Sequence, residues 1–378
     1  MRPLLDFCSA NADQLRSQIE TLVRLESPST DKAAVDRCGA TLVRLLEAAG
    51  GSVTRFPQSN RGDHVLAEFP GGPRTVLVLG HFDTVWGVGQ IQRMPFIEED
   101  GRLFGPGIFD MKSSIAVALL AVRALRELRM RRPRVVMLWT TDEEIGSHSS
   151  RAIIEAQAQQ SDAVLVVEPS LPGGGAKTGR KGCGEFTITA HGVSAHAGID
   201  PRKGASAIHE LAHQILALQA LSELDHGVSV NVGVISGGTR GNVIAERASA
   251  TVDVRVPIMA DAKRLEAAVR SLRPHNQAVR LEIEGGFDRP PLERNAGVAR
   301  LYEEARTVAA ALGRSLDEGV TGGGSDGNFT AALGVPTLDG LGPQGDGAHA
   351  LHEHVIIEDL PWRAAFLAAL MERLNTVK

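Results

Sequence analysis

Four stretches of the sequence decide its fold: TVLVLG (75–80), MKSSIAVALLAVRALREL (111–128), RVVMLWTT (134–141) and DAVLVVEP (162–169). The first, third and fourth are short apolar runs of strand-forming residues, which is the pattern of buried strands. The second has the apolar spacing of a helix. Strands that alternate with helices favour a mainly parallel sheet that helices cover. The stretches therefore predict an α/β fold.

A glycine-rich stretch, LPGGGAK (171–177), interrupts this alternation and is typical of a domain edge. Residues 184–287 then predict a strand, a helix, two strands, a helix and a strand, which is the ferredoxin-like α+β order. From residue 288 the sequence returns to the earlier pattern. We therefore predict a larger domain formed by residues 1–176 and 288–378, with a smaller domain of residues 177–287 inserted into it.

The composition argues against several classes of protein. The 378 residues carry a formal net charge of −5, and no run of Lys and Arg forms a stripe for nucleic acid. No apolar run reaches ~18 residues, and the first residues lack the pattern of a leader peptide. We expect neither nucleic acid nor a membrane as partner, and either a cytoplasmic protein or a mature periplasmic chain whose leader was removed.

The cysteines also restrict the chemistry. Cys8, Cys38 and Cys183 form no C-x-x-C pair, so neither a disulfide framework nor a thiolate zinc site is predicted. Any metal ligands must therefore be histidine and carboxylate side chains.

Metal-binding side chains follow several of the predicted strands. In open parallel sheets, ligands bind outside the carboxyl ends of the strands, so we expect these side chains to converge on one crevice. Imidazole and carboxylate suit zinc, cobalt or manganese, and one bridging carboxylate can hold two such ions. The candidates are His81, Asp83, Asp110, Asp142, Glu143, Glu144 and Glu168.

Glu143 and Glu144 are the most informative pair among these candidates. Adjacent carboxylates repel each other unless a cation or a proton intervenes, and a catalytic metal supplies that cation. One of the two can then bind metal while its neighbour takes a proton from the bound water. A single acidic residue at a strand end is usually a solvated cap of the next helix, so the combination carries the prediction.

Five motifs follow one another along the chain: HFDTVW (81–86), GPGIFDMK (105–112), TTDEEIGS (140–147), VVEPS (166–170) and GGGSDGN (322–328). Together they resemble the signature of the two-zinc exopeptidases, a family that includes bacterial glutamate carboxypeptidase, aminoacylase, acetylornithine deacetylase and succinyl-diaminopimelate desuccinylase. They cover nearly the whole chain in the family's order, and the inserted domain lies where the family has its lid or dimerisation domain. They are most similar to the motifs of glutamate carboxypeptidase.

The resemblance implies a site for two Zn²⁺ ions, with Co²⁺ or Mn²⁺ as substitutes. His81 and Glu168 would bind one ion, and Glu144 would bind the other. Asp110 would bridge both ions, and in the family this aspartate precedes a peptide bond that is often cis, here to Met111.

The last ligand is a histidine near the end of the chain, where GAHALHEHVIIEDL (347–360) offers three. In the family this histidine follows a small residue and precedes a glutamate by about four positions. His349 fits best, because Glu353 follows it at that spacing. His352 is the alternative, and His354 is more typical of a surface residue.

The resemblance also implies catalytic roles. Glu143 would be the general base, and Asp83 would orient the His81 imidazole. His196 matches a histidine that enters the partner subunit's active site and polarises the scissile carbonyl. This match implies a homodimer formed through the inserted domain.

Candidate substrate-binding residues lie in and beside the inserted domain. Asn242 and Arg255 match family positions that contact the substrate carboxylate. Arginine side chains and unhindered backbone N–H groups bind carboxylates, and the sequence offers further residues that could supply such groups. The further candidates are Arg180, Lys181, Arg289, Gly323, Gly324 and Ser325.

One motif competes with this assignment. HELAH (209–213) matches the H-E-x-x-H zinc pattern, but no continuation and no strong third ligand follow it. The apolar stripe of its predicted helix leaves His209 and Glu210 near the solvent. We therefore predict an ordinary amphipathic helix.

The predicted function is the hydrolysis of an amide bond next to a free carboxylate, in an N-acyl amino acid or a peptide, as by glutamate carboxypeptidase. An N-acyl-amino-acid deacylase of the acetylornithine deacetylase or aminoacylase type uses the same core residues and is the alternative. A non-catalytic metal-binding scaffold is the remote alternative, and it would be favoured by loss of Glu143 or of a ligand, none of which is lost.

Overall fold

The computed structural model describes residues 1–376 and divides into two compact units. Unit 1 comprises Met1–Gly179, Glu293–Thr321 and Ser325–Lys378, the last described as far as residue 376. Unit 2 comprises Arg180–Leu292 and Gly322–Gly324. Each unit has its own hydrophobic core and is described by itself. Within residues 1–376, no helix combines the length and the apolar character that crossing a membrane would take.

Unit 1 is built on a six-stranded sheet with the order β1-β2-β6-β3-β7-β14. β3 pairs in parallel with β6 and β7, and β14 pairs in parallel with β7, whereas β1 and β2 form an antiparallel edge. The predicted mainly parallel sheet is therefore confirmed. The strands are β1 (Ser52–Phe56), β2 (His64–Phe69), β3 (Gly72–His81), β6 (Pro133–Thr140), β7 (Ala163–Val166) and β14 (Thr337–Leu338).

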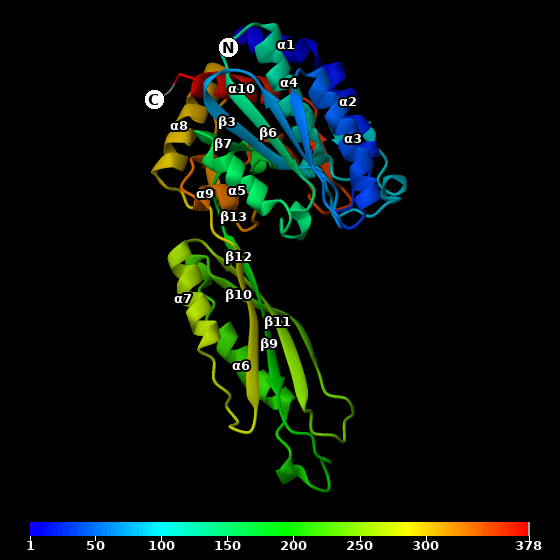
Figure 1. Ribbon diagram of the computed structural model, residues 1–378, viewed down its shortest axis with the longest axis vertical. Helices are drawn as coiled ribbons and strands as arrows, with labels where there is room; N and C mark the ends of the chain where they lie inside the picture. The colour runs from blue at the N-terminus through cyan, green and yellow to red at the C-terminus, as the bar shows by residue number, and fades with distance from the viewer. Residues whose placement is uncertain (377–378) are drawn as a thin grey trace. The chain divides into compact units, whose positions relative to one another are not determined.

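Helices cover both faces of this sheet (Figure 1). Because side chains alternate along a strand, Val76 and Val78 of β3 pack into one core cluster, and Leu77 and Leu79 pack into another. Helices α5 and α9 contribute to the second cluster, and the other helices of unit 1 contribute to the first. The helices are α1 (Arg2–Ala10), α2 (Ala12–Arg24), α3 (Lys32–Ala48), α4 (Ser113–Glu127), α5 (Arg151–Gln159), α8 (Ala296–Ala311), α9 (Gly327–Ala332) and α10 (Asp359–Leu374).

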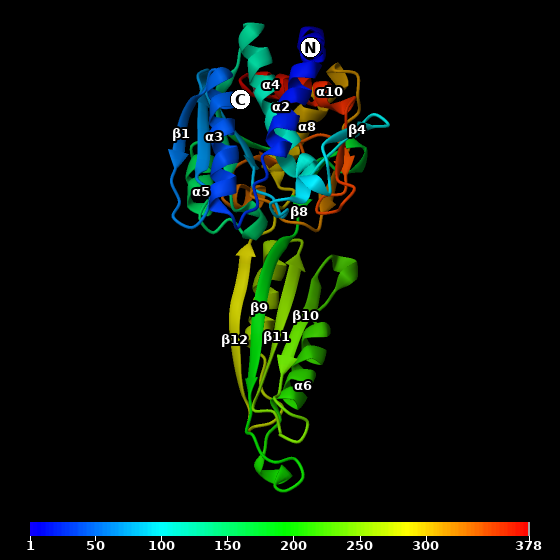
Figure 2. The same ribbon diagram turned by 90° about the vertical axis from the view of Figure 1, so that its right-hand side faces the viewer.

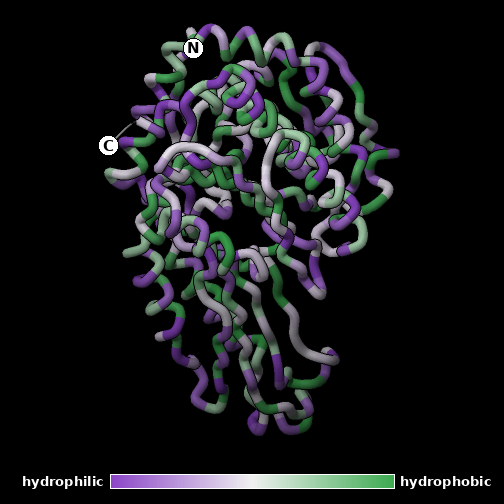
Figure 3. Tube along the Cα trace, turned by 45° about the horizontal axis from the view of Figure 1, so that its top comes forward, coloured by the Kyte–Doolittle hydropathy of each residue, from purple (hydrophilic) through white to green (hydrophobic). Residues whose placement is uncertain are grey.

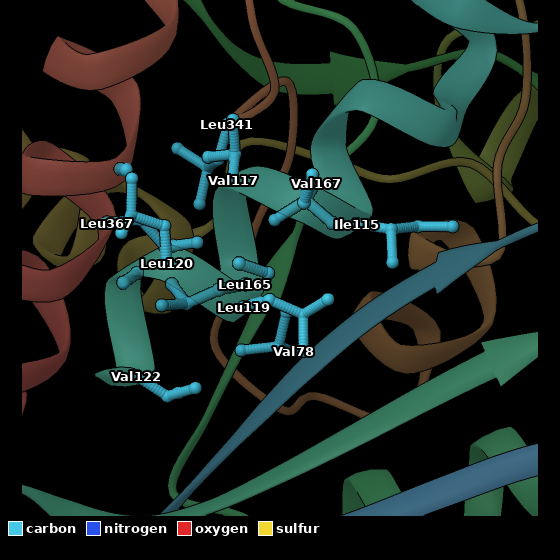
Figure 4. Close-up of a cluster of buried hydrophobic side chains, with 14 of the residues drawn as sticks. Val78, Ile115, Val117, Leu119, Leu120, Val122, Leu165, Val167, Leu341 and Leu367 are labelled. Atoms are coloured by element: carbon cyan, nitrogen blue, oxygen red, sulfur yellow. The ribbon is translucent and has the colours of Figure 1, made fainter. Parts of the chain in front are cut away.

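Helix α4 is buried along almost its whole length. In Figure 4, its Leu119 side chain lies close to Val78 of β3 and Leu165 of β7. Complete burial of one such side chain contributes about 1.5–3 kcal/mol to stability. A short irregular turn, η2 (Ile108–Lys112), leads directly into this helix, so the packing of α4 fixes the place of η2.

Two smaller sheets complete unit 1. One is antiparallel with the order β15-β16-β5-β4, and in the other β8 pairs with β13. The register of the first places His354 opposite Phe104, so the segments that precede His354 and follow Phe104 are neighbours. The strands are β4 (Ile97–Glu99), β5 (Arg102–Phe104), β8 (Ala176–Arg180), β13 (Glu318–Thr321), β15 (Gly345–Asp346) and β16 (His354–Ile356).

Unit 2 contains a four-stranded antiparallel sheet with the order β10-β11-β9-β12 (Figure 2). Its elements follow one another as β9, α6, β10, β11, α7 and β12, so the predicted order is confirmed. Both helices pack on the same core cluster, and hydrophilic and hydrophobic residues mix along the trace (Figure 3). The elements are β9 (Gly182–His191), α6 (Ala207–Gln219), β10 (Ser229–Gly237), β11 (Arg247–Val256), α7 (Met259–Arg270) and β12 (Arg280–Arg289).

Helix α6 carries the HELAH motif, and the solvent position predicted for Glu210 is wrong. Glu210 is 2% exposed, and its carboxylate accepts hydrogen bonds from the backbone N–H groups of His275 and Asn276, each at 2.8 Å. The Gln214 amide donates to the same carboxylate at 2.6 Å. His209 is exposed, as predicted. Glu210 therefore holds a loop of unit 2 in place.

Candidate metal centre

The predicted metal ligands of unit 1 come together at one edge of its six-stranded sheet. His81 is the last residue of β3, Glu144 lies in the turn η3 (Glu143–Ile145) after β6, and Glu168 follows β7. These three strands are parallel neighbours, so their carboxyl ends meet. Asp110 in η2 and His349 in the turn before β16 complete the cluster.

The His81 imidazole faces two of these carboxylates. Its Nε2 atom lies 3.2 Å from Asp110 Oδ1 and 3.5 Å from Glu168 Oε1. The ring is 1% exposed. Burial opposes a charged imidazolium, but the hydrogen bonds to Asp110, Asp83 and Glu168 outweigh burial and raise the pKa of His81 well above its ordinary value.

The His349 imidazole faces the other pair of carboxylates. Its Nε2 atom lies 3.4 Å from Asp110 Oδ2 and 3.1 Å from Glu144 Oε2. Hydrogen bonds to Asp110 and Glu144 raise the pKa of His349 to about 10, although burial opposes the shift. The alternative, His352, is exposed. The surface position expected for His354 is wrong, because its side chain is buried and its ring packs against that of Phe104.

Asp110 lies between these two sets of side chains. Its Oδ1 atom faces His81 and its Oδ2 atom faces His349. Burial opposes the charge of Asp110, but the hydrogen bonds to His349 and His81 lower its pKa. Burial and the nearby charge of Asp110 raise the pKa of Glu144, against the hydrogen bond to His349. The Asp110–Met111 peptide bond is cis.

This set of donors fits divalent cations. Ligand atoms of His81, Asp110 and Glu144 lie within 4.8 Å of one another. The Oε1 atom of Glu144 is buried and has no hydrogen-bond partner among residues 1–376, so one oxygen is left for a cation. Two imidazoles with three carboxylates suit zinc, cobalt or manganese.

Asp83 lies on the far side of the His81 ring. The Nδ1 atom of His81 lies 3.0 Å from the backbone carbonyl oxygen of Asp83 and 3.4 Å from the carboxylate atom Oδ1. The other carboxylate oxygen accepts hydrogen bonds from the Ser29 hydroxyl at 2.7 Å and the Glu144 backbone N–H at 3.3 Å. The backbone carbonyl is thus the closer partner of the imidazole.

Two buried aspartates support the turn that begins with Glu143, and sequence reasoning did not assign them this role. Asp142 Oδ2 accepts hydrogen bonds from the backbone N–H of Ser149 at 2.6 Å and from its hydroxyl at 2.7 Å. Asp326 accepts a short hydrogen bond from the Ser147 hydroxyl. Asp142 was one of the metal-binding candidates, but its carboxylate closes the turn.

In unit 2, His196 is exposed and has a defined hydrogen-bonding state. Its Nδ1 atom accepts hydrogen bonds from the backbone N–H groups of Gly198 and Ile199, each at 3.1 Å. A neutral ring that accepts at Nδ1 carries its proton on Nε2, so Nε2 is a donor. Asn242 is also exposed, and its backbone carbonyl accepts from the Ala197 N–H at 3.0 Å.

The predicted substrate arginines have partners within unit 2. Arg255 Nη2 donates to Asp253 Oδ2 at 2.8 Å, and Arg255 Nη1 donates to Cys183 Sγ at 2.7 Å. Arg180 Nη1 donates to the backbone carbonyls of Gly323–Gly324 at 3.1 and 3.0 Å. Arg180 thus helps to hold the glycine-rich turn in place.

The remaining substrate candidates differ in exposure. Arg289 is buried and Lys181 is half-buried. Ser325 belongs to unit 1, where its hydroxyl donates to Asp339 Oδ2 at 2.6 Å and its N–H donates to Asn328 Oδ1 at 3.0 Å. Both donors of Ser325 therefore have partners in unit 1. The roles of all these residues, like those of the proposed ligands, stay predictions.

One carboxylate beside the centre was not predicted as a site residue. Glu353 is 1% exposed and accepts hydrogen bonds from the loop that carries Asp110. Burial raises the pKa of Glu353 to about 7, although these hydrogen bonds oppose the shift. Its spacing from His349 was used only to choose among the histidines.

Known proteins are similar to this chain over most of its length. The family model described as Peptidase family M20/M25/M40 matches residues 77–373. Carboxypeptidase G2 of Pseudomonas sp. (strain RS-16) is 29% identical over 372 residues, which cover 95% of this chain and 89% of that protein. Succinyl-diaminopimelate desuccinylase of Xanthomonas oryzae pv. oryzae is 30% identical over 362 residues, which cover 89% of this chain and 93% of that protein.

Solved structures share the fold. An aminopeptidase from Bacillus cereus has a TM-score of 0.81 at 22% identity, over 96% of this chain and 99% of that one. An M20 family metallo-carboxypeptidase from Sulfolobus solfataricus has a TM-score of 0.74 at 18% identity, over 96% and 99% of the two chains. With the family match over residues 77–373, these likenesses place the chain among the metal-dependent hydrolases of the M20/M25/M40 peptidase family.

Proposed function

We propose that the chain cleaves the amide bond between an acyl group and an amino acid that has a free α-carboxylate, with glutamate as the amino acid released. The position of Asp110 carries this proposal, because its two oxygens face two separate sets of metal-binding side chains. The likeness to carboxypeptidase G2 supports the carboxypeptidase activity.

Two Zn²⁺ ions are proposed as the native metals, with Co²⁺ or Mn²⁺ as substitutes. His81, Glu168 and Asp110 Oδ1 would hold one ion. His349, Glu144 and Asp110 Oδ2 would hold the other. When bound, such ions polarise the amide carbonyl and lower the pKa of a water molecule.

Glu143 is proposed as the general base. It directly precedes the proposed ligand Glu144 in the turn η3, and this adjacency supports the proposal. A carboxylate oxygen of Glu143 accepts a proton from the attacking water and then delivers it to the leaving amine nitrogen. One carboxylate thus serves as base and then as acid.

Residues of unit 2 are proposed to bind the substrate. His196, from a second copy of the chain, would donate from Nε2 to the oxygen that becomes negative, and its hydrogen bonds at Nδ1 support this role. Arg255, Asn242 and Arg289 would bind the α-carboxylate, with Lys181 as a further candidate. Arg180 would hold the turn of Gly323 and Gly324, so that the backbone N–H groups of this turn can bind the substrate carboxylate.

A homodimer is proposed for the same reason, because His196 would act in a second copy. The edge of the unit 2 sheet supports association. β10 is one of the two edge strands, and its Val234 and Ile235 side chains are 61% and 59% exposed. Exposed apolar edge strands are sites at which chains associate.

An N-acyl-amino-acid deacylase is the second candidate. The likeness to succinyl-diaminopimelate desuccinylase favours it, since that protein's name denotes removal of an acyl group. The metal-binding residues would be the same in both cases, and only the recognised acyl group would differ.

The test is a panel of N-acyl amino acids, with folate-type and acetyl or succinyl acyl groups, incubated with zinc-loaded protein with and without chelator. Chelator-sensitive release of glutamate from the folate-type substrate would establish the carboxypeptidase. Release from the acetyl or succinyl substrates alone would establish the deacylase, and no release at all would overturn both.

The Glu143→Ala variant tests the mechanism on whichever substrate is cleaved. We expect turnover to fall about 10²–10⁴-fold, as for loss of a general acid–base. Metal content, measured by elemental analysis, should equal that of the wild type because Glu143 is not a proposed ligand. A variant that turns over at the wild-type rate would overturn the assignment.

A further inference from the structure

Glu353 connects three segments that are far apart in the sequence. It lies directly before β16, four residues after His349. The pairing of β16 with β5 brings it to the start of the loop that carries Asp110, where the Gly105 N–H approaches the Glu353 carbonyl at 3.4 Å. Its side chain points into that loop.

Four N–H groups converge on the Glu353 carboxylate. The backbone N–H groups of Phe109 and Asp110 donate to Oε1, each at 3.0 Å. The Gly107 N–H at 2.9 Å and the Trp86 indole N–H at 2.8 Å donate to Oε2. Both oxygens are therefore saturated, and one of the donors belongs to the residue that faces both imidazoles.

A glycine of the loop adds to the conformational entropy that is lost when the loop is ordered. Gly107 has a positive φ of +70°, and a Cβ atom there would lie 2.5 Å from Thr84 Cγ2. Only glycine readily adopts this φ and also leaves the space near Thr84 free. Glycine loses more conformational entropy on folding than any other residue. A buried carboxylate that accepts three backbone N–H groups compensates for this loss.

We propose that Glu353 is a positioning residue that holds Asp110 where it faces both His81 and His349. The inference rests on the proposed metal centre. Glu353 itself bonds to the loop and to Trp86, so its effect on metal binding passes through Asp110. A neighbouring buried cation, Lys112, donates to the Leu25 carbonyl at 2.7 Å and belongs to the same motif as Asp110.

The test is the affinity of metal-stripped protein for Zn²⁺, measured by isothermal titration calorimetry. Glu353→Gln keeps the size of the side chain but turns one acceptor oxygen into a donor that faces N–H groups. We expect its zinc affinity to fall ~10–100-fold, as when residues that orient metal ligands are lost. Trp86→Phe should lower the zinc affinity less than Glu353→Gln does, because the three backbone N–H donors to Glu353 remain.

Glu26→Gln is the matched control. The Glu26 carboxylate also clamps a loop, through the backbone N–H groups of Gly89 at 2.8 Å and Ile91 at 2.9 Å, but that loop carries no proposed ligand. We expect the control to bind Zn²⁺ as the wild type does. Hydrogen exchange of residues 105–112 should accelerate in Glu353→Gln and stay unchanged in the control.

A folded Glu353→Gln variant with wild-type zinc affinity would overturn the proposal, as would equal losses in the control. If Glu353→Gln does not fold, Glu353→Asp keeps the charge with a shorter reach, and its zinc affinity should fall between those of the wild type and of Asp110→Asn. Because calorimetry needs no substrate, a selective loss of affinity supports the positioning role even if the wild type cleaves none of the N-acyl amino acids.

Discussion

The two sheets of this protein place their charged side chains differently. In unit 1, β3, β6 and β7 are apolar where helices cover them, and the proposed metal ligands begin where these strands end. In unit 2, helices cover only one face of the sheet, and charged residues such as Glu185 and Glu284 lie exposed along its strands.

The difference follows from the solvent. A charge in a buried region is costly unless an opposite charge or a metal ion accompanies it, whereas water screens a charge on an open sheet face. Carboxylates at the end of the unit 1 sheet should therefore be sensitive to substitution. Those on the open face of unit 2 should tolerate it.

The largest effect is expected for Asp110→Asn. The change removes the one charge that both imidazoles share, so zinc content and turnover should both be lost. The matched control is Glu284→Gln on the open sheet, which should keep both and change the free energy of unfolding by no more than about 0.5 kcal/mol. Elemental analysis measures the zinc content of both variants, and the hydrolysis assay measures their turnover. If Asp110→Asn and Glu284→Gln behaved alike, the contrast between the two sheets would be wrong.

The next effect is on stability and concerns a buried ion pair of unit 1. Asp359 and Arg363 are each 1% exposed, and Arg363 Nε donates to Asp359 Oδ2 at 2.9 Å. Asp359→Asn leaves the guanidinium buried without its carboxylate. The free energy of unfolding should fall by about 3–5 kcal/mol, as measured by chemical denaturation. A change as small as that of Glu284→Gln would contradict the argument.

The same pair predicts a dependence on pH. Burial opposes the charge of Asp359, but the Arg363 guanidinium and several hydrogen bonds lower its pKa below the ordinary value. The stabilisation is therefore complete above the unfolded pKa of ~3.9 and is lost as the pH falls through the lower folded pKa. The stability difference between wild type and Asp359→Asn should stay constant above ~pH 3.9 and shrink as the pH falls from there through the lower folded pKa of Asp359.

The smallest effect is expected for Asp83→Asn. The His81 Nδ1 atom lies closer to the Asp83 backbone carbonyl than to its carboxylate, and asparagine keeps that carbonyl. Turnover should fall near the lower end of the ~10–100-fold typical of residues that orient a ligand. A loss as large as that of Asp110→Asn would show that the carboxylate, not the backbone, holds the ring.

The fold could be predicted because its signals are local. The parallel strands β3, β6 and β7 each contain a short apolar run, and each is followed by residues that the pattern alone picks out, such as His81 and Glu168. The family motifs then supplied the bridging role of Asp110 and the choice of His349, and both residues lie in turns without periodicity.

What sequence missed depends on contacts between distant segments. Glu353 meets Trp86 and Gly107 across more than half of the chain, and no local pattern reports such a contact. Glu210 was misplaced for a related reason. Its helix face was assigned from apolar residues alone, whereas a polar side chain can be buried when backbone N–H groups of another segment satisfy it.

The connection between the units has a consequence for biosynthesis. The strands and helices of unit 2 come from one continuous stretch, whereas β14 of the unit 1 sheet and the proposed ligand His349 come after it. On the ribosome, domains fold in the order in which their chain emerges. Unit 2 therefore has all of its secondary structure elements before unit 1 does, and the proposed metal centre gains its second histidine, His349, only near the end of translation.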